Sequence, residues 1–280
     1  MAMSEQDQRV LKALEKARDQ HKELVDLLDF YHDLYEVQFQ AKGDLPDPEV
    51  RDELAMRWRL EGGIPQLTFD QLRLDPATFA ELVARVAGVL HRYHPSWDLG
   101  YEARGQEELI ESAREVFETW DTLTTPGPGS TEEPDGESLR DHPAALAVGF
   151  ALAPYLQRAA DSILPQLDLT SWTRGHCPIC GGRPNFALLE EETGARQLMC
   201  SRCSALWSYR RAGCPFCTTE ERPSYYSSED GLHRLYFCAA CKGYLKTADL
   251  RNARRVVHPM VERLLTVGMD LAAQQEGYGG

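Results

Sequence analysis

Eight cysteines carry the chemistry that this sequence can perform, and they form four pairs with the same spacing. Each pair has the pattern Cys-x-x-Cys: Cys177 with Cys180, Cys200 with Cys203, Cys214 with Cys217, and Cys238 with Cys241. Two intervening residues let the chain turn so that both sulfurs point to one centre, with backbone N–H groups free to donate to the thiolates. Each pair therefore supplies half of a four-thiolate metal site.

The pairs are arranged as a duplicated unit. Nineteen residues separate the first two pairs, 20 separate the last two, and only 10 lie in the middle gap. A shift of 37 residues carries the first pair onto the third, and a shift of 38 carries the second onto the fourth. We therefore expect two tandem modules, each a hairpin with two metal-binding knuckles and one tetrahedral site. The short strands are expected at residues 186–189, 197–199, 225–227 and 235–237.

Three interpretations compete for paired cysteines. Disulfides are disfavoured by the two-residue spacing and by the reducing cytosol expected below, and a thioredoxin-like redox pair needs a βαβ context that the sequence does not indicate. Four thiolates leave no open coordination position, so a metal site of this kind cannot activate a bound water. Zinc would make the sites structural, whereas iron could also change its oxidation state, and the ligand set does not choose between them.

The elements that must position these cysteines are indicated by composition and charge. The chain has 280 residues, of which 42% are hydrophobic and 26% are charged, as in a globular protein of one large or two modest domains. The net charge is −14, but residues 171–280 hold 14 Lys and Arg against 11 Asp and Glu. All eight cysteines lie in this second part, so we place a boundary near residue 170. The acidic total argues against general nucleic-acid binding.

The first part of the chain has the apolar spacing of helices. We predict one long helix from about residue 10 to 43, a helix after Pro48 with Leu54, Ala55 and Trp58 facing inward, and a helix capped by Asp75 that ends at His94. Further helices are expected over 106–120 and 143–164. The Pro-, Gly- and acid-rich residues 124–137 are expected to form a surface loop. Residues 259–272 have the pattern of an amphipathic C-terminal helix.

The predicted fold class is α+β, with an all-α N-terminal domain followed by two rubredoxin-like or zinc-ribbon modules and a C-terminal helix. The expected limits are 1–170, 171–211, 212–256 and 257–280. No stretch approaches about 18 uninterrupted apolar residues, and the N-terminus lacks the pattern of a secretory signal. We therefore expect a cytoplasmic protein that does not insert into a membrane.

Sequence around the cysteines resembles the formate dehydrogenase accessory protein (FdhE) family. The resemblance begins at residues 172–184, which contain the segment Gly175-His176-Cys177-Pro178-Ile179-Cys180-Gly181-Gly182. It continues at residues 198–203 with Trp207 after them, at Arg210-Arg211 before Cys214, at residues 238–246, and at residues 275–278. The helical part is also similar, with Gly63-Ile64-Pro65 at a proline-containing turn. Most of the chain is covered.

This resemblance implies an assembly factor rather than an enzyme. Members of the family act on respiratory formate dehydrogenases that contain selenocysteine and molybdenum, contact the catalytic subunit before export, and have a rubredoxin-like, iron-binding region. The eight cysteines match the metal-ligating positions of that region. One departure is Thr218, which follows Cys217 where rubredoxin knuckles usually have glycine and which could loosen hydrogen bonding to sulfur there.

We predict that the metal-bound modules present a surface that recognises the catalytic subunit, beside the acidic helical part. The candidate contact residues are Arg174, Arg202, Trp207, Arg210, Arg211 and Tyr244. A zinc-ribbon protein that binds nucleic acid or the transcription machinery is an alternative, as is a rubredoxin-type electron carrier. A homodimer is compatible with the sequence.

Overall fold

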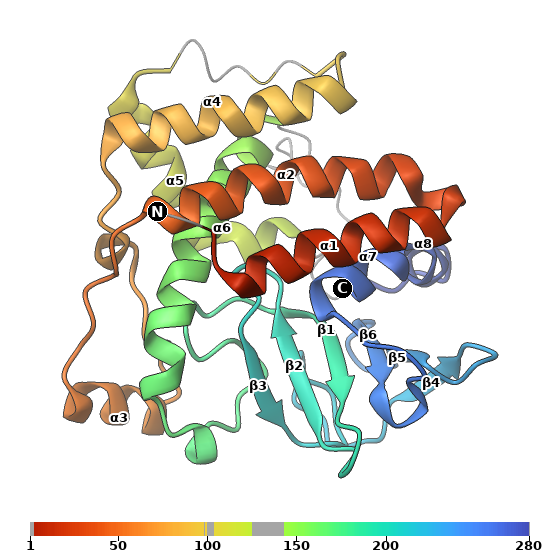
Figure 1. Cartoon of the computed structure of the whole chain (residues 1–280). Helices are drawn as coiled ribbons and strands as arrows, with labels where there is room; N and C mark the ends of the chain where they lie inside the picture. The colour runs from red at the N-terminus through yellow and green to blue at the C-terminus, as the bar shows by residue number, and fades with distance from the viewer. Residues whose placement is uncertain (1–2, 98, 100–103, 125–142, 280) are drawn as a thin grey trace. The chain divides into compact units, whose positions relative to one another are not determined.

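The computed structural model describes residues 3–97, 99, 104–124 and 143–279 (Figure 1). The chain divides into two compact units, one comprising Met1–Glu49 with Thr68–Ala159 and the other Val50–Leu67 with Ala160–Gly280. The limits of the predicted domains stay predictions. Within the described residues, no helix is long and apolar enough to cross a membrane.

The first unit consists of helices, in agreement with the sequence. Its elements are α1 (Glu5–Gln20), η1 (Lys22–Leu24), α2 (Val25–Asp44), η2 (Phe69–Leu72), α4 (Pro76–Tyr93), α5 (Gln106–Thr124) and most of α6 (Pro143–Ile163). The cap predicted for α4 is confirmed, because the Asp75 side chain accepts a hydrogen bond from the Thr78 N–H and Pro76 opens the helix. The predicted loop at 124–137 falls almost entirely outside the described residues.

The prediction of one long N-terminal helix was wrong at its middle. The chain breaks at His21 and returns, so that α1 and α2 lie side by side as a hairpin (Figure 1). Lys42 Nζ donates to Asp7 Oδ1 at 2.7 Å, which joins the start of α1 to the end of α2 through a buried ion pair. No Gly or Pro marks the break, and only packing between the two helices reveals it.

Helix α3 (Glu53–Glu61) lies within the predicted stretch, but it begins at Glu53 with Asp52 as its cap rather than at Pro48, and its opposite face is buried. Met56 and Leu60 are 7% and 5% exposed, whereas Leu54 and Trp58 are 78% and 66% exposed. The inward orientation predicted for Leu54 and Trp58 was therefore wrong. The helix is short, so an apolar pair one turn apart on either face satisfies the same pattern.

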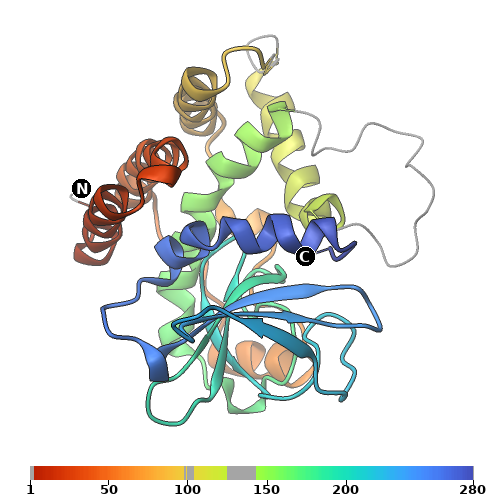
Figure 2. The same cartoon turned by 90° about the vertical axis from the view of Figure 1, so that its right-hand side faces the viewer.

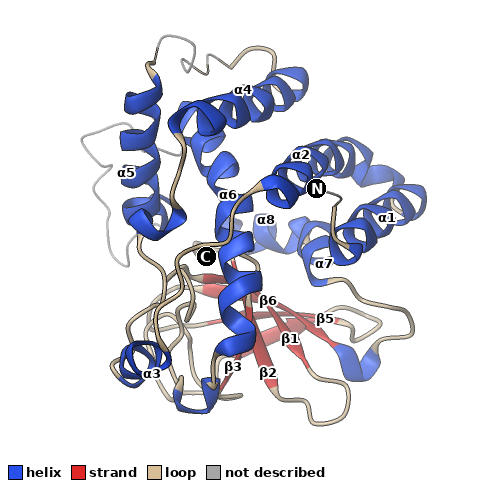
Figure 3. Cartoon of the chain, turned by 60° about the vertical axis from the view of Figure 1, so that its left-hand side comes forward, coloured by secondary structure: helices blue, strands red, loops and turns tan. Residues whose placement is uncertain are grey.

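The second unit contains one six-stranded mixed sheet that joins both cysteine modules (Figure 3). Its strands are β1 (Pro184–Leu189), β2 (Arg196–Cys200), β3 (Leu206–Tyr209), β4 (Ser224–Ser227), β5 (His233–Phe237) and β6 (Tyr244–Asp249). The order is β3-β2-β1-β6-β5-β4, so each module contributes three antiparallel strands. The two sets meet where β1 and β6 run parallel, with Phe186 opposite Lys246. The predicted strands are present, and β3 and β6 extend each hairpin by one strand.

Two C-terminal helices cover one face of this sheet, as Figure 2 shows. They are α7 (Pro259–Leu265) and α8 (Val267–Gln275), which meet at Thr266 where a single helix was predicted. Met260 and Val257 pack against a buried cluster that includes Phe186 and Met199. Short helices η4 (Leu164–Gln166), η5 (Leu169–Ser171) and η6 (Leu250–Asn252) complete the unit. The predicted α+β class is confirmed.

Candidate metal centres

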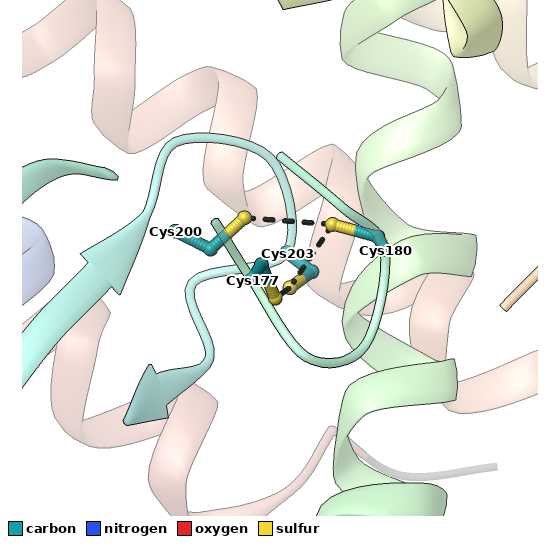
Figure 4. Close-up of side chains that lie close together, drawn as sticks. All are labelled: Cys177, Cys180, Cys200 and Cys203. Atoms are coloured by element: carbon teal, nitrogen blue, oxygen red, sulfur yellow. Dashed lines mark hydrogen bonds between the residues drawn. The ribbon is translucent and has the colours of Figure 1, made fainter. Parts of the chain in front are cut away.

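The first two cysteine pairs meet in one cluster (Figure 4). Their four sulfurs all lie within 4.8 Å of one another, and all four residues are buried. Cys177 Sγ is 3.6 Å from Cys203 Sγ, and Cys180 Sγ is 3.5 Å from Cys200 Sγ and 3.6 Å from Cys203 Sγ. The side chains come from two loops and point toward one another around a common centre.

These separations fit a tetrahedral metal site. A metal–sulfur bond of about 2.3 Å places the corners of a regular tetrahedron about 3.8 Å apart. A disulfide would need about 2.05 Å between sulfurs, and all eight cysteines are free thiols in this structure. The cluster can therefore hold one ion through four thiolates, and it leaves no corner for water or substrate.

The second two pairs form an equivalent but more open cluster. Cys214 Sγ lies 3.6 Å from Cys241 Sγ, and Cys217 Sγ lies 3.7 Å from Cys238 Sγ. Cys214 and Cys238 are buried, whereas Cys217 and Cys241 are half-buried. The two clusters therefore share a ligand set and differ in how far solvent reaches the sulfurs.

All four knuckles have the same backbone closure. The N–H of the first cysteine donates to the carbonyl five residues later, at distances of 2.9–3.0 Å: Cys177 to Gly182, Cys200 to Ala205, Cys214 to Thr219, and Cys238 to Gly243. Backbone N–H groups also donate to sulfur at 3.4 Å, from Ile179 to Cys177, from Arg202 to Cys200, and from Phe216 to Cys214. These bonds shape each pair before any ion arrives and stabilise negative charge on sulfur.

The residue after each pair adopts a left-handed backbone conformation. The φ angles are 77° at Gly181, 58° at Ser204, 59° at Thr218 and 57° at Lys242. Only the first of these is glycine, and a β-branched residue such as Thr218 is the least suited to this region. The Thr218 N–H still donates to the Cys214 carbonyl at 3.1 Å. The departure from the knuckle pattern thus introduces backbone strain and leaves the fold of the knuckle intact.

Hydrogen bonds from neighbouring groups lower the pKa of Cys180, and against the effect of burial they also lower the pKa of Cys238. Burial makes four other thiols of the clusters poor acids when no cation is bound. It raises the pKa of Cys177 and Cys203 well above the ordinary thiol value, and it also raises the pKa of Cys214. A cation that binds the clusters must therefore displace protons, so binding becomes weaker as the pH falls.

A segment remote in sequence holds the first knuckle. The Gln66 N–H donates to the Pro178 carbonyl at 2.9 Å, and the Leu67 N–H donates to the Ile179 carbonyl at 2.8 Å. His176 Nε2 also lies 3.2 Å from the Gly63 carbonyl. The sequence did not predict this contact, because neither its spacing nor its composition links the Gly63–Leu67 turn to the cysteines.

Two of the predicted partner-contacting residues are buried aromatics. Trp207 is 2% exposed and donates from Nε1 to the Arg174 carbonyl at 3.2 Å. Tyr244 is 8% exposed, and its hydroxyl donates to Asp270 Oδ1 at 2.9 Å. Contact with a partner would need both rings to become exposed, so the aromatic part of the predicted surface stays a prediction.

The four predicted arginines differ in how they are placed. Arg174 and Arg211 are exposed, and Arg202 is half-buried beside the first cluster. Arg210 is exposed, but its guanidinium donates to the carbonyls of Thr218 and Thr219 in the third knuckle. Arg210 therefore supports the second module, and a substitution there would also disturb the cysteines.

Residues 176–211 match the family model described as "FdhE, central domain". The protein FdhE homolog of Aquifex aeolicus is 34% identical over 133 residues, which span 45% of this chain and 46% of that protein. The protein FdhE homolog of Pseudomonas aeruginosa is 27% identical over 246 residues, which span 83% of this chain and 72% of that protein.

The fold is shared with a solved structure as well. The crystal structure of the FdhE protein from Pseudomonas aeruginosa has a TM-score of 0.63 at 23% identity and covers 99% of this chain and 94% of that one. The fold and the paired clusters define a helical protein with tandem four-cysteine modules. By the central-domain match and the curated relatives, the chain is similar to proteins of the FdhE family. It aligns with about half the length of the Aquifex relative.

Proposed function

We propose that this protein is an accessory factor for the maturation of formate dehydrogenase, which it serves in the cytoplasm by binding the catalytic subunit. The similarity to FdhE proteins, in the central segment and along most of the chain, carries this proposal. The closed geometry of both clusters supports a role in binding rather than in turnover, because four thiolates occupy every position of a tetrahedral ion.

The eight cysteines are proposed to ligate two ions, one in each cluster. Iron and zinc both suit four thiolates in a tetrahedron, and bound metal would supply folding energy to each module. The strands connect directly to the ligands, since β2 ends at Cys200 and β6 begins just after Gly243. Ligation would therefore fix the ends of the sheet and the loops between them.

Exposed arginines supply the proposed contact surface. Arg174 precedes the first knuckle, and Arg211 lies in the link between the modules. Arg211 is the better residue to test. The backbone carbonyl of Arg174 accepts a hydrogen bond from Trp207, so a substitution at Arg174 could also disturb the packing of that ring. A guanidinium at the edge of a metal-bound module can form a charge-assisted hydrogen bond with a carboxylate of a partner.

The proposal is tested by affinity capture from formate-grown cells. The parent chain should retain the formate dehydrogenase catalytic subunit, and Arg211→Glu should retain several-fold less while it binds the same amount of metal. Arg222→Glu is the matched control, because Arg222 is also exposed and lies close to the second cluster in sequence. Failure of the parent chain to capture the catalytic subunit would contradict the proposed function. Equal capture by Arg211→Glu would contradict only the assigned surface.

A further inference from the structure

Arg196 is a buried cation without a carboxylate partner among the described residues. Only 2% of the residue is exposed, although it carries a guanidinium at the first position of β2. Other buried cations of the chain differ in this respect, since Lys42 contacts Asp7 and Lys246 contacts Asp270. A buried charge with no opposite charge is costly, so its counter-charge has to be sought.

The hydrogen bonds of Arg196 lead to the second cluster. Its Nη2 donates to the Gly213 carbonyl at 2.9 Å and to the Arg210 carbonyl at 2.5 Å. Gly213 immediately precedes Cys214. A second nitrogen of the guanidinium, Nε, is buried and has no hydrogen-bond partner. Arg196 also lines a small cavity together with Cys214 and Cys238.

Further contacts at this point tie the first module to the second. The guanidinium of Arg196 lies over the Tyr209 ring, 5.1 Å from its centre, and the Tyr209 hydroxyl donates to the Cys214 carbonyl at 3.2 Å. A Cβ atom on Gly175 would stand 1.9 Å from the Pro215 carbonyl oxygen, so the backbones of the two modules touch there. Side chains on β2 and β3 of the first module thus position the third knuckle, which belongs to the second.

We propose that Arg196 is the positioning and charge-balancing residue of the second four-cysteine site. Four thiolates around a divalent ion carry a net charge of −2, and a guanidinium enclosed beside them in a low-dielectric interior supplies the opposite charge. Its contacts with the Arg210 and Gly213 carbonyls hold the backbone that leads into Cys214 in the conformation that the knuckle needs. Arg196 lies on the strand that ends at Cys200, so a metal ion that fixes Cys200 in the first site also fixes the position of Arg196 beside the second site. This inference rests on the metal assignment proposed above.

The test is a competitive zinc titration of the full-length apo-protein without oxygen, against a chromophoric chelator. The parent chain should take up two equivalents. Arg196→Gln should leave the first equivalent unchanged and weaken the second by about 10–100-fold, the range typical for loss of an outer-shell partner of a metal ligand. Arg196→Lys should lie between the parent and Arg196→Gln, because it keeps a charge but loses the fork. Arg222→Gln is the control and should match the parent.

Alkylation followed by peptide mass mapping identifies the weakened site. In Arg196→Gln at limiting zinc, Cys214, Cys217, Cys238 and Cys241 should react, while the first four cysteines stay protected. Two sites of parent affinity, or two sites weakened equally, would overturn the inference. If Arg196→Gln does not fold, Arg196→Lys carries the test, and two sites of parent affinity in that variant would overturn it. A parent chain that binds no zinc or iron would contradict the metal assignment itself.

Discussion

The backbone N–H of Leu67 donates to the carbonyl of Ile179 at 2.8 Å, and through this bond the residues after α3 become part of the first metal knuckle. Gln66 makes the neighbouring bond to Pro178. Ile179 is fully buried. The first cluster is therefore enclosed by a segment from the helical part of the sequence as well as by its own strands, which accounts for its lower solvent exposure.

Gly63 is expected to be required for this enclosure. Its φ is +69°, and a Cβ atom there would stand 2.5 Å from Arg174 Nε. Gly63→Ala should lower the free energy of unfolding by about 1–2 kcal/mol, because an L-residue is strained in that region. Urea denaturation of the metal-loaded chain measures the change. The control is Gly88→Ala in α4, where a Cβ meets nothing within 4 Å and stability should rise by about 0.5–1 kcal/mol. A Gly63→Ala variant as stable as the parent would refute the requirement.

Thr218→Gly should make the protein more stable. Thr218 has a φ of 59°, and glycine adopts this conformation without the cost borne by a β-branched residue. We expect a gain of about 1 kcal/mol, seen as a higher melting temperature of the metal-loaded chain. Thr219→Gly changes the adjacent threonine, which lacks the positive φ, and should not stabilise. A lower melting temperature for Thr218→Gly would show that the threonine side chain contributes more than its backbone costs.

The more open second cluster should lose its ion first. Cys217 and Cys241 are half-buried, whereas every cysteine of the first cluster is buried. Excess chelator should therefore remove metal in two phases, and alkylation during the fast phase should label the second cluster. The rates can be followed by chelator absorbance and by mass mapping of the labelled peptides. Release in one phase, or labelling of Cys177 before Cys217, would contradict the assignment of lability to solvent exposure.

Glu262 should make stability depend on pH below about 4.5. Its side chain is 1% exposed, and burial alone would raise its pKa, but hydrogen bonds from His233 and Arg255 hold the pKa below the usual 4.5. The ionised carboxylate therefore stabilises the fold above the unfolded pKa. This contribution is lost as the pH falls through the folded pKa, because the unfolded state then binds more protons.

Glu262→Gln measures this contribution. At pH 7 the substitution should cost about 2 kcal/mol, because the buried carboxylate loses its charge-assisted hydrogen bonds with Arg255, whose own side chain is 39% exposed. Between pH 5 and pH 3 the stability of the variant should fall less steeply than that of the parent, as measured by urea unfolding at a series of pH values. Glu229→Gln, at an exposed turn, should change neither quantity. Parallel pH profiles for Glu262→Gln and the parent would exclude Glu262 as the source of the acid dependence.

Much of the second unit can be predicted from cysteine spacing alone. Cys-x-x-Cys pairs specify their own turns, and a repeat of 37 or 38 residues implies two similar modules. The structure brings together the two sets of four that the spacing indicated. What spacing could not provide is the parallel pairing of β1 with β6, because that contact joins the modules and depends on neither knuckle.

The errors arose where packing between elements decides the structure. Nothing at His21 signals a helix end, and the buried pair of Asp7 with Lys42 becomes visible only when α1 and α2 are side by side. In α3, apolar residues stand on two faces of the helix, and the structure buries the face with Met56 rather than the face with Trp58. A sequence pattern predicts a helix or a turn well where a capping residue or a metal ligand marks it, as at Asp75. It predicts less well where the structure depends on packing against a segment far along the chain.

Two ions are proposed to occupy the two clusters, each bound by four thiolates with no coordination position left open. Elemental analysis of the full-length protein purified without oxygen, combined with thiol counting before and after denaturation in chelator, tests this proposal most directly. The account predicts two equivalents of iron or zinc per chain, few reactive thiols in the native protein, and eight after metal removal. Freshly isolated protein with no stoichiometric metal, and with its cysteines reactive or joined as disulfides, would contradict it.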